Sequence, residues 1–249
     1  MSRDWDARTY DRVADPQTRW GATVLERLPL TGDERVLDAG CGSGRVTELL
    51  ADRLPNGRIV ALDGSASMID AARERLARFG DRIEYVVADL GQPLPIDGQV
   101  GAVLSTAVFH WVPDHDALFR NLAAVTAPGG WLIAQCGGAG NIARVMAVLG
   151  RTGDGWLGDK YFATPLDTTR RLDAAGYVDI ECWLTDQPTW FDRGEPFETF
   201  LRTVILGAHL DRLPTHERDA FVHTVAEALD EPMIDYVRLN ISARRAAPA

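Results

Sequence analysis

The feature that most constrains this chain is segment 36–44, in which three glycines stand at alternate positions after an apolar run. It reads Val-Leu-Asp-Ala-Gly-Cys-Gly-Ser-Gly. Residues 45–53 follow with helical spacing, since Val46, Leu49 and Leu50 fall on one side. The segment therefore predicts a strand, a tight glycine turn and a helix. That is the layout of a nucleotide site at the carboxyl end of a parallel strand.

The spacing of the glycines limits which class of nucleotide ligand the turn is expected to bind. In a dinucleotide fingerprint, Gly-x-Gly-x-x-Gly, the third glycine would fall at Arg45, so a dehydrogenase with the same sheet is disfavoured. The chain instead has Asp-x-Gly-x-Gly-x-Gly, from Asp38 through Gly40 and Gly42 to Gly44. Positions without side chains let a ligand approach the backbone, and amides at the start of the next helix favour a carboxylate or phosphate.

Two acids follow the next predicted strands. Asp63 ends the strand 58–62 and lies 25 residues after Asp38. An acid there can accept hydrogen bonds from both hydroxyls of a ribose. The alternative is a helix N-cap, for which Ser65 and Ser67 are better placed. Asp89 follows the strand 83–88 and could accept a hydrogen bond from an adenine amino group, or it could be a solvated loop acid.

The net charge and the lengths of the apolar runs exclude some classes of binding partner. The net charge is −10, which argues against nucleic acid or an anionic membrane as a partner. No apolar run reaches the roughly 18 residues of a membrane span, and no apolar signal segment follows Met1, so we expect a cytoplasmic protein. A chain of 249 residues fits one large domain, or a core domain with an insertion.

Cysteine, histidine and lysine usage points away from metal or redox chemistry. Cys41, Cys136 and Cys182 are far apart and form no Cys-x-x-Cys pair. The five histidines show no metal-ligand spacing, so we expect neither a zinc site nor a disulfide framework. Cys41, inside the glycine turn, is expected to be a packing thiol. Lys160 is the only lysine, which we attribute to the codon composition of a GC-rich bacterial genome.

The rest of the chain alternates between helical and strand patterns. Residues 1–20 are polar and aromatic, and either pack on the core or form a lid that brings Tyr10 and Arg19 to the ligand. Residues 150–158 are glycine-rich and read as a mobile loop or linker. Further helices are predicted from residue 15 to 28 and over 67–79, 114–125, 141–149, 165–175, 197–210 and 217–229, and further strands over 101–107, 131–136, 177–184 and 234–243.

Taken together, these patterns resemble the class I S-adenosylmethionine-dependent methyltransferases over about residues 33–185. The resemblance rests on segments 36–44, 59–63, 86–90 and 122–134, the last with its Pro128-Gly129-Gly130 turn. It implies an α/β fold with a Rossmann-like, doubly wound, seven-stranded sheet whose last strand is antiparallel, and a helical cap inserted between strands six and seven. Residues 1–249 would form one methyltransferase domain, with N-terminal lid helices (1–30), a cofactor-binding core (31–190), the cap (195–231) and the final strand (234–245).

A finer resemblance is to the trans-aconitate and malonyl-carrier O-methyltransferases. It rests on Trp5-Asp6, Tyr10, Thr18-Arg19, Phe109–His115 and 127–136. It implies O-methylation of a carboxylate or hydroxyl group on a small-molecule acceptor by a monomer or homodimer that uses no nucleic acid, membrane or metal. The cap departs from the trans-aconitate pattern, because its Leu-Arg-Pro run is missing and Leu-Asp-Arg-Leu-Pro stands at 210–214.

Other reactions on this fold stay open. A nucleic-acid amino-methylating enzyme would carry Asn/Asp-Pro-Pro-aromatic after strand four, where Ser-Thr-Ala-Val stands at 105–108. N- or C-methylation of a small molecule is an alternative. So is a protein that binds the cofactor without transferring its methyl group, because its cofactor pocket would look the same.

The resemblance implies roles for particular residues. S-adenosylmethionine would be bound, and S-adenosylhomocysteine released, with its methionine end at the glycine turn, its ribose on Asp63 and its adenine near Asp89. Trp111, His209 and Arg212 would face the acceptor. The full set implied for the cofactor is Asp38, Gly40, Gly42, Gly44, Asp63, Gly64, Met68, Asp89, Leu90, Ser105, Tyr10 and Arg19.

The candidate for catalysis is His110, either as a general base or as a wall of the site. A carboxylate is ionised at pH 7 and needs no base, whereas an alcohol, phenol or amine must lose a proton. His115, at a predicted helix start, is expected to be solvated. Trp183 and Trp190 are expected to fill the core around strand six.

Overall fold

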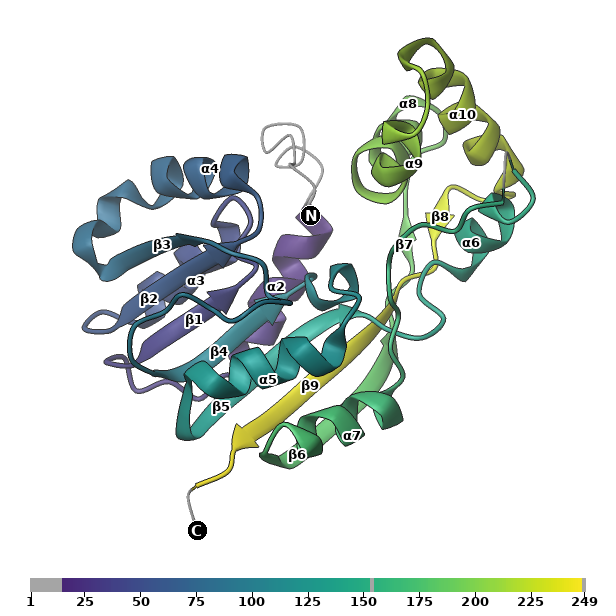
Figure 1. The fold of residues 1–249 in the computed structure, drawn as a ribbon. Coiled ribbons are helices and arrows are strands. Elements are labelled where there is room, and N and C mark those ends of the chain that lie inside the picture. The colour runs from purple at the N-terminus through teal and green to yellow at the C-terminus, as the bar shows by residue number, and fades with distance from the viewer. Residues whose placement is uncertain (1–14, 153–154, 248–249) are drawn as a thin grey trace.

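The computed structural model describes residues 15–152 and 155–247. Its centre is a seven-stranded sheet of order β3-β2-β1-β4-β5-β9-β6. β1 to β5 are parallel, and β9 is antiparallel to both β5 and β6. The predicted Rossmann-like α/β fold with an antiparallel final strand is confirmed (Figure 1). The strands are β1 (Arg35–Ala39), β2 (Arg58–Asp63), β3 (Ile83–Val87), β4 (Val100–Thr106), β5 (Thr126–Gly137), β6 (Tyr177–Asp186) and β9 (Val237–Arg245).

Helices cover both faces of this sheet, because its central strands are apolar on both faces. Along β1, Val36 packs in the cluster with α2, α3 and α4, while its neighbour Leu37 packs in the opposite cluster with α5 and α7. Both side chains are fully buried. The helices around the sheet are α2 (Asp15–Glu26), α3 (Arg45–Arg53), α4 (Ala66–Leu76), α5 (His115–Val125) and α7 (Pro165–Ala174).

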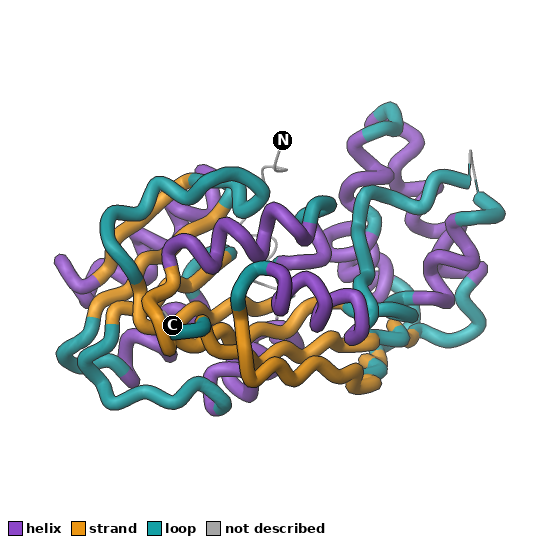
Figure 2. Tube along the Cα trace, turned by 60° about the horizontal axis from the view of Figure 1, so that its bottom comes forward, coloured by secondary structure: helices purple, strands orange, loops and turns teal. Residues whose placement is uncertain are grey.

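A helical cap stands beyond the carboxyl ends of the parallel strands (Figures 1 and 2). It has its own apolar cluster, to which Val145 and Val148 contribute along with Phe197, Phe200 and Val225. The helix α6 therefore belongs with the cap, although the sequence placed it in the cofactor-binding core. The cap elements are α6 (Ala143–Leu149), α8 (Glu195–Phe200), a π-helix (Leu201–Ile205), α9 (Gly207–Asp211), α10 (Thr215–Ala228) and the pair β7 (Thr189–Trp190) and β8 (Met233–Ile234).

Two predicted helices are interrupted. The helix expected over 67–79 ends at Leu76 and continues as a 3-10 turn (Ala77–Arg82), in which Gly80 has a φ of 56°. The helix expected over 197–210 is broken by the π-helix. A π-helix adds a residue to one turn and is often found at functional sites. Helical periodicity alone does not distinguish these local changes of pitch from a continuous helix.

The N-terminal segment packs on the sheet where it is described. Val24, Leu25 and Leu28 of α2 and the turn after it are buried in the cluster with α3 and α4. Trp20 meets Tyr236 edge to face at 5.0 Å between ring centroids, so α2 also reaches the strand connection next to the cap. Tyr10 and the Arg19 side chain lie outside the described residues. The lid that was expected from residues 1–30 stays a prediction.

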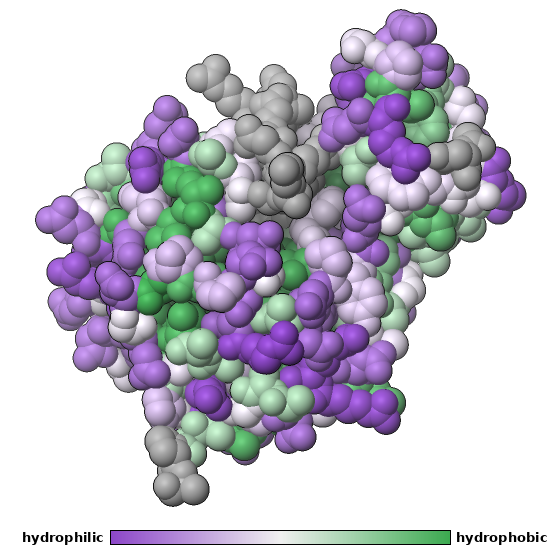
Figure 3. Space-filling model, viewed as in Figure 1, coloured by the Kyte–Doolittle hydropathy of each residue, from purple (hydrophilic) through white to green (hydrophobic). Residues whose placement is uncertain are grey.

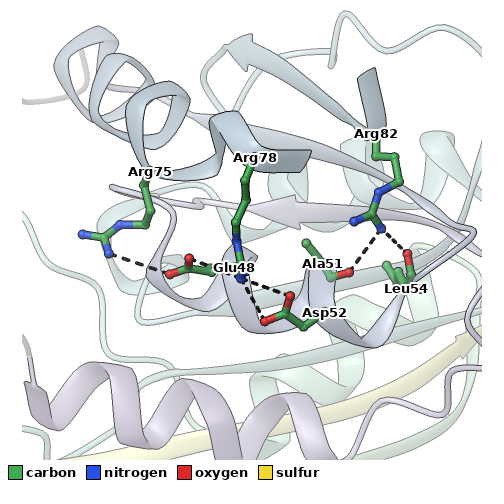
Figure 4. A network of polar contacts seen from close by, with 7 residues as sticks. All are labelled: Glu48, Ala51, Asp52, Leu54, Arg75, Arg78 and Arg82. Atoms are coloured by element: carbon green, nitrogen blue, oxygen red, sulfur yellow. Dashed lines mark hydrogen bonds and ion pairs between the residues drawn. The ribbon is translucent and has the colours of Figure 1, made fainter. Parts of the chain in front are cut away.

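Ion pairs join α3 to α4 and the turn after it (Figure 4). Arg78 lies 3.1 Å from Asp52 and 3.5 Å from Glu48. Arg78 and Asp52 are 58% and 55% exposed, so we expect the pair to contribute little to stability. Arg75 has a second role, because its Nε donates to the carbonyl oxygen of Ser43 at 2.9 Å and so ties α4 to the glycine turn.

The surface seen in the orientation of Figure 1 is mostly hydrophilic at the tip of the cap and along the rim of the core, with an apolar band on the core (Figure 3).

Trp190 is 61% exposed and Trp183 is 38% exposed, so the expectation that both fill the core is wrong. Within residues 15–152 and 155–247, no helix has the length and hydropathy needed to cross a membrane.

Candidate active site

A cavity of about 460 Å³ lies between the carboxyl ends of the parallel strands and the cap. This volume is in the range of small-molecule sites, roughly 300–1,000 Å³. Thr106 at the end of β4 and most of the connection that follows it, up to Pro113, line the cavity. The side from the sheet, which we call the sheet half, includes Gly40, Gly42, Asp63, Gly64, Met68, Asp89 and Leu90. The side toward the cap, the cap half, includes Asn141, Lys160, Ile205, His209 and Arg238.

The glycine turn is shaped to leave room for a ligand. Gly40 and Gly42 both line the cavity and have φ values of 88° and 54°, in the left-handed region that favours glycine. A Cβ on Gly40 would collide with the side chain of Val108, whereas a Cβ on Gly42 would meet no protein atom within 4 Å. The N–H groups of Gly40 and Cys41 donate to Leu62 O, which holds the turn against β2.

Asp63 lines the cavity and also fastens the glycine turn. Its Oδ2 accepts from Gly42 N and its Oδ1 from Ser65 N, both at 2.9 Å. Burial raises the pKa of Asp63, and these backbone hydrogen bonds partly oppose that shift. Ser65 is the N-cap of α4, since its Oγ accepts from Met68 N at 3.3 Å. Each carboxylate oxygen keeps a second lone pair, which a ribose hydroxyl could use.

Three residues of the set implied for the cofactor lie behind the cavity wall. Asp38, Gly44 and Ser105 are not among the residues that line the cavity. A Cβ on Gly44 would approach the side chains of Leu76 and Ala72, so this glycine lets α4 pack closely. Ser105 is buried, and its Oγ donates to Ala39 O at 2.7 Å. These residues shape the turn from behind.

Asp38 is an acid enclosed by protein. It is 1% exposed, and its Oδ2 accepts from the Thr47 hydroxyl at 2.7 Å. Its Oδ1 has no hydrogen-bond partner among the described residues. Burial raises the pKa of Asp38 to about 7; the Thr47 hydrogen bond opposes this shift, and the nearby charge of Asp63 adds to it. The carboxyl group therefore changes its charge close to neutral pH.

The pocket expected for adenine has an apolar floor and a polar edge. Met68 and Leu90 are nearly buried and line the cavity, as does the exposed Asp89. One oxygen of Asp89 accepts from Gly91 N at 2.9 Å, which orients the carboxylate at the edge. Val112 also lines this region, and the sequence did not single it out.

His110 sits in the 3-10 turn Phe109–Trp111 after β4 and is 8% exposed. Its Nδ1 accepts from the backbone N–H of Gly137 at 3.2 Å. Burial lowers the pKa of His110 well below its usual value, and the charges of Arg238, Lys160 and His115 lower it further. The ring is therefore neutral at pH 7.

The prediction for His115 is wrong, because its side chain is only 2% exposed. Its Nε2 lies 2.9 Å from Phe109 O, and its ring packs edge to face on Phe119 and Tyr161. The helix start that suggested solvent is covered by the segment containing Tyr161, which comes from a distant part of the chain.

Of the residues expected to face the acceptor, two line the cavity and one does not. Trp111 and His209 line it, and His209 Nε2 lies 3.0 Å from Trp156 O. Arg212 is exposed, is not among the lining residues, and has its guanidinium 4.2 Å from the ring centroid of Trp156. The expected contact of Arg212 with substrate is therefore not supported by its position.

Two cations that were not predicted to belong to the site, Lys160 and Arg238, line the cap half. Lys160 Nζ donates to Ile205 O at 2.8 Å and lies 4.7 Å from the ring centroid of Trp111. Arg238, on β9, is 3% exposed, and its Nε donates to Gln135 Oε1 at 3.4 Å. Lys160 is the only lysine of the chain, and this was the sequence signal that could have pointed to a role in the site. Asp159 also lines the cavity but is exposed.

Backbone strain also marks the site. Three non-glycine residues in the described part of the chain have positive φ, and two of them, Ala107 (61°) and Ile142 (52°), line the cavity. Such conformations concentrate at functional sites, where surrounding packing enforces them. Among the described residues, no group of three or more His, Cys, Asp or Glu side chains is placed to hold a metal ion.

Known proteins with similar sequences are methyltransferases, the class that the glycine turn and the sheet indicate. Residues 36–130 match a family model described as "Methyltransferase domain". The chain is 29% identical to a trans-aconitate 2-methyltransferase of Methylobacterium radiotolerans over 98% of this chain and 99% of that protein. It is 39% identical to a trans-aconitate 2-methyltransferase of Variovorax paradoxus, over 53% of this chain. Against that relative and several others of the same name, the matching segment spans only about half of the relative's length.

Among solved structures, the fold is similar to Haemonchus contortus phosphoethanolamine N-methyltransferase 2, which was solved with phosphomonomethylethanolamine and S-adenosylhomocysteine. The match covers 97% of this chain and 57% of that one, with a TM-score of 0.66 and 18% identity. At this identity, the likeness concerns the fold alone.

Proposed function

Because this chain belongs to the class I S-adenosylmethionine-dependent methyltransferases, we propose that it methylates a carboxylate oxygen of a small organic acid. The observation that carries the proposal is the pair of cationic side chains, Lys160 and Arg238, in the cap half of the cavity. Charge-assisted hydrogen bonds from lysine and arginine are the usual means of holding a carboxylate. The acid would therefore be held by the cap half, next to the cofactor.

The sheet half has the features that the family's cofactor requires. Gly40 and Gly42 expose backbone at the cavity, and Gly42 has open space where a side chain would stand. Asp63 would hold the ribose hydroxyls, and Met68 and Leu90 would pack on the adenine. When bound, S-adenosylmethionine supplies a methyl carbon on a positively charged sulfur, whose displacement by a carboxylate oxygen gives a methyl ester and S-adenosylhomocysteine.

A carboxylate acceptor suits the charges of the cap half better than a hydroxyl acceptor does. A carboxylate is already ionised at pH 7, so no proton has to be removed as the carbon–oxygen bond forms. An alcohol or phenol would need a base. Lys160 and Arg238 are cations that hold negative charge and do not accept a proton. The chain then contributes alignment, which can lower the barrier by about 7–11 kcal/mol when the geometry is tight.

The test is release of S-adenosylhomocysteine from labelled S-adenosylmethionine against a panel of acceptors. The panel holds di- and tricarboxylic acids, acyl carriers, phenols, alcohols and amines. It begins with trans-aconitate, the acid in the names of several relatives. We expect release with acids only. Release only with phenols or alcohols would refute the carboxylate proposal. No release with any acceptor, while the cofactor still binds, would favour the cofactor-binding protein without transfer.

The role of the cations is tested with a matched pair of variants. Lys160→Met should lower kcat/KM for the acid about 10- to 100-fold, corresponding to the loss of one charge-assisted hydrogen bond. Arg120→Met removes an exposed positive charge outside the cavity and should leave kcat/KM unchanged. Calorimetry with S-adenosylhomocysteine should give the same dissociation constant for both variants. Equal kcat/KM values for both variants would show that Lys160 does not hold the acid.

A further inference from the structure

The His110 ring is held in one place by its neighbours on several elements. It stacks on Phe162 at 5.9 Å and lies 5.1 Å from the Trp111 ring, measured between centroids. The charged and titratable groups around it are Arg238 of β9, Lys160 of the segment before α7, His115 of α5 and Cys136 of β5. Burial raises the pKa of the Cys136 thiol to about 12, so this neighbour carries no charge at neutral pH.

The two ring nitrogens of His110 have different surroundings. Gly137 is the last residue of β5, and its N–H donates to Nδ1 at 3.2 Å. The cross-strand partner of Gly137 in β9 is Arg238, so the strand pairing fixes this amide in place. No hydrogen bond from Nε2 occurs within the described residues, and Nε2 is not among their enclosed, unpartnered atoms. It is therefore the ring nitrogen left accessible from the cavity.

A backbone amide determines which nitrogen carries the proton. An amide N–H always donates, so Nδ1 must present a lone pair to Gly137. In a neutral ring the single proton then lies on Nε2. A proton on Nδ1 would face the amide hydrogen directly. The ring is kept neutral by burial and by the positive charges of Arg238 and Lys160, which lower the pKa of His110.

We propose that His110 is a hydrogen-bond donor to the acceptor carboxylate, through Nε2–H, and does not act as a general base. The inference deepens the proposed function and rests on it. Nε2 has no lone pair to take a proton while Nδ1 accepts from Gly137. It can instead hold one oxygen of the carboxylate, with Lys160 and Arg238 supplying positive charge nearby. The other oxygen forms the new bond to carbon, the electron pair of the broken carbon–sulfur bond returns to sulfur, and no proton moves.

The tautomer is measured directly, without an acceptor. Long-range proton–nitrogen NMR on protein labelled with ¹⁵N-histidine distinguishes an Nε2–H ring from an Nδ1–H ring. The His110 signals are identified by their loss in His110→Gln. We expect the Nε2–H pattern between pH 6 and pH 9, and a shift of the Nε2 signal when trans-aconitate is added in the presence of S-adenosylhomocysteine. An Nδ1–H pattern would overturn the assignment even if methyl transfer to acids is confirmed.

Three substitutions separate a donor from a base and from a wall. Glutamine keeps an N–H donor, so His110→Gln should stay within about tenfold of the wild-type kcat/KM. His110→Ala and His110→Glu should each lose about 10- to 100-fold, because one has no donor and the other repels the acid. The wild-type kcat/KM should be constant from pH 6 to pH 9. An active glutamate variant with an inactive glutamine variant would identify a base, and an alanine variant equal to wild type would identify a wall.

A control variant and a binding measurement distinguish the loss of the His110 side chain from misfolding of the protein. His216→Gln changes a histidine whose side chain is 82% exposed and should have no effect. Each variant should bind S-adenosylhomocysteine as the wild type does, which shows that the sheet half is intact. If no acid is methylated at all, the proposed function fails, while the NMR pattern still decides the tautomer.

Discussion

Replacing Asp38 by asparagine should make the protein more stable at pH 8 than the wild type. The Asp38 carboxyl is enclosed behind the glycine turn, and one of its oxygens has no hydrogen-bond partner among the described residues. Asparagine has nearly the same shape, keeps an oxygen for the Thr47 hydroxyl, and carries no charge to bury. The gain should develop above the pH at which the carboxyl ionises in the unfolded chain, because wild-type folding must then either bind a proton or bury the charge.

The magnitude follows from the two pKa values. The pKa of Asp38 rises from 3.8 to about 7 on folding, because burial disfavours the charged form. The native state thus binds the proton more tightly, and its stability falls as the pH rises from the unfolded value through the native one. Between pH 5 and pH 8 the wild type should lose on the order of 3 kcal/mol of unfolding free energy relative to Asp38→Asn.

The assay is urea denaturation followed by tryptophan fluorescence at pH 5, 6, 7 and 8. The quantity of interest is the difference in unfolding free energy between variant and wild type, which should grow with pH up to about pH 7 and then level off. Asp70→Asn, at an exposed site on α4, is the matched control and should show no such trend. A difference that is the same at every pH would refute the raised pKa of Asp38.

Other changes test the cavity residues. Asp63→Ala should weaken the binding of S-adenosylhomocysteine by about 1.5–3 kcal/mol, since hydrogen bonds to a charged group are lost; an unchanged dissociation constant in calorimetry would remove Asp63 from the site. Gly40→Ala should lower the melting temperature, and adding Val108→Ala should restore only part of the loss, because the φ of 88° stays unfavourable; full restoration would leave steric contact as the sole cause. Arg212→Ala should leave the KM for the acceptor unchanged, because its guanidinium stacks on Trp156 outside the cavity; a raised KM in steady-state kinetics would return Arg212 to the acceptor site.

Much of the fold could be predicted from local sequence signals. The glycine turn needs left-handed backbone that other residues adopt at a cost, so its position is visible in the sequence. The apolar strands between helical patterns predicted the parallel sheet, because both of its faces must be covered. The acids Asp63 and Asp89 follow strands whose carboxyl ends meet at one edge, and both line the cavity. These features depend on residues close together in the chain.

The composition of the cap half could not be predicted in this way. Lys160 and Arg238 are far apart in sequence but line the same cavity, and Arg238 lies there because β9 inserts between β5 and β6. In β9, polar and apolar residues alternate, which predicts one solvated face. The structure covers that face, and Arg238 and Asn240 are 3% and 4% exposed. Alternation shows which side chains share a face but not whether another element packs on it.

The sequence by itself determined the strand–turn–helix unit and the succession of strands and helices along the chain, because backbone conformation and apolar periodicity are properties of neighbouring residues. Only the tertiary structure decided that Asp38 is enclosed while Asp63 faces the cavity, although Asp63 is the last and Asp38 the second-last residue of a parallel strand. The same holds for His110, whose proton position depends on an amide of another strand, Gly137. Burial and hydrogen bonding to distant backbone set the charge of these groups, and packing between distant segments creates both.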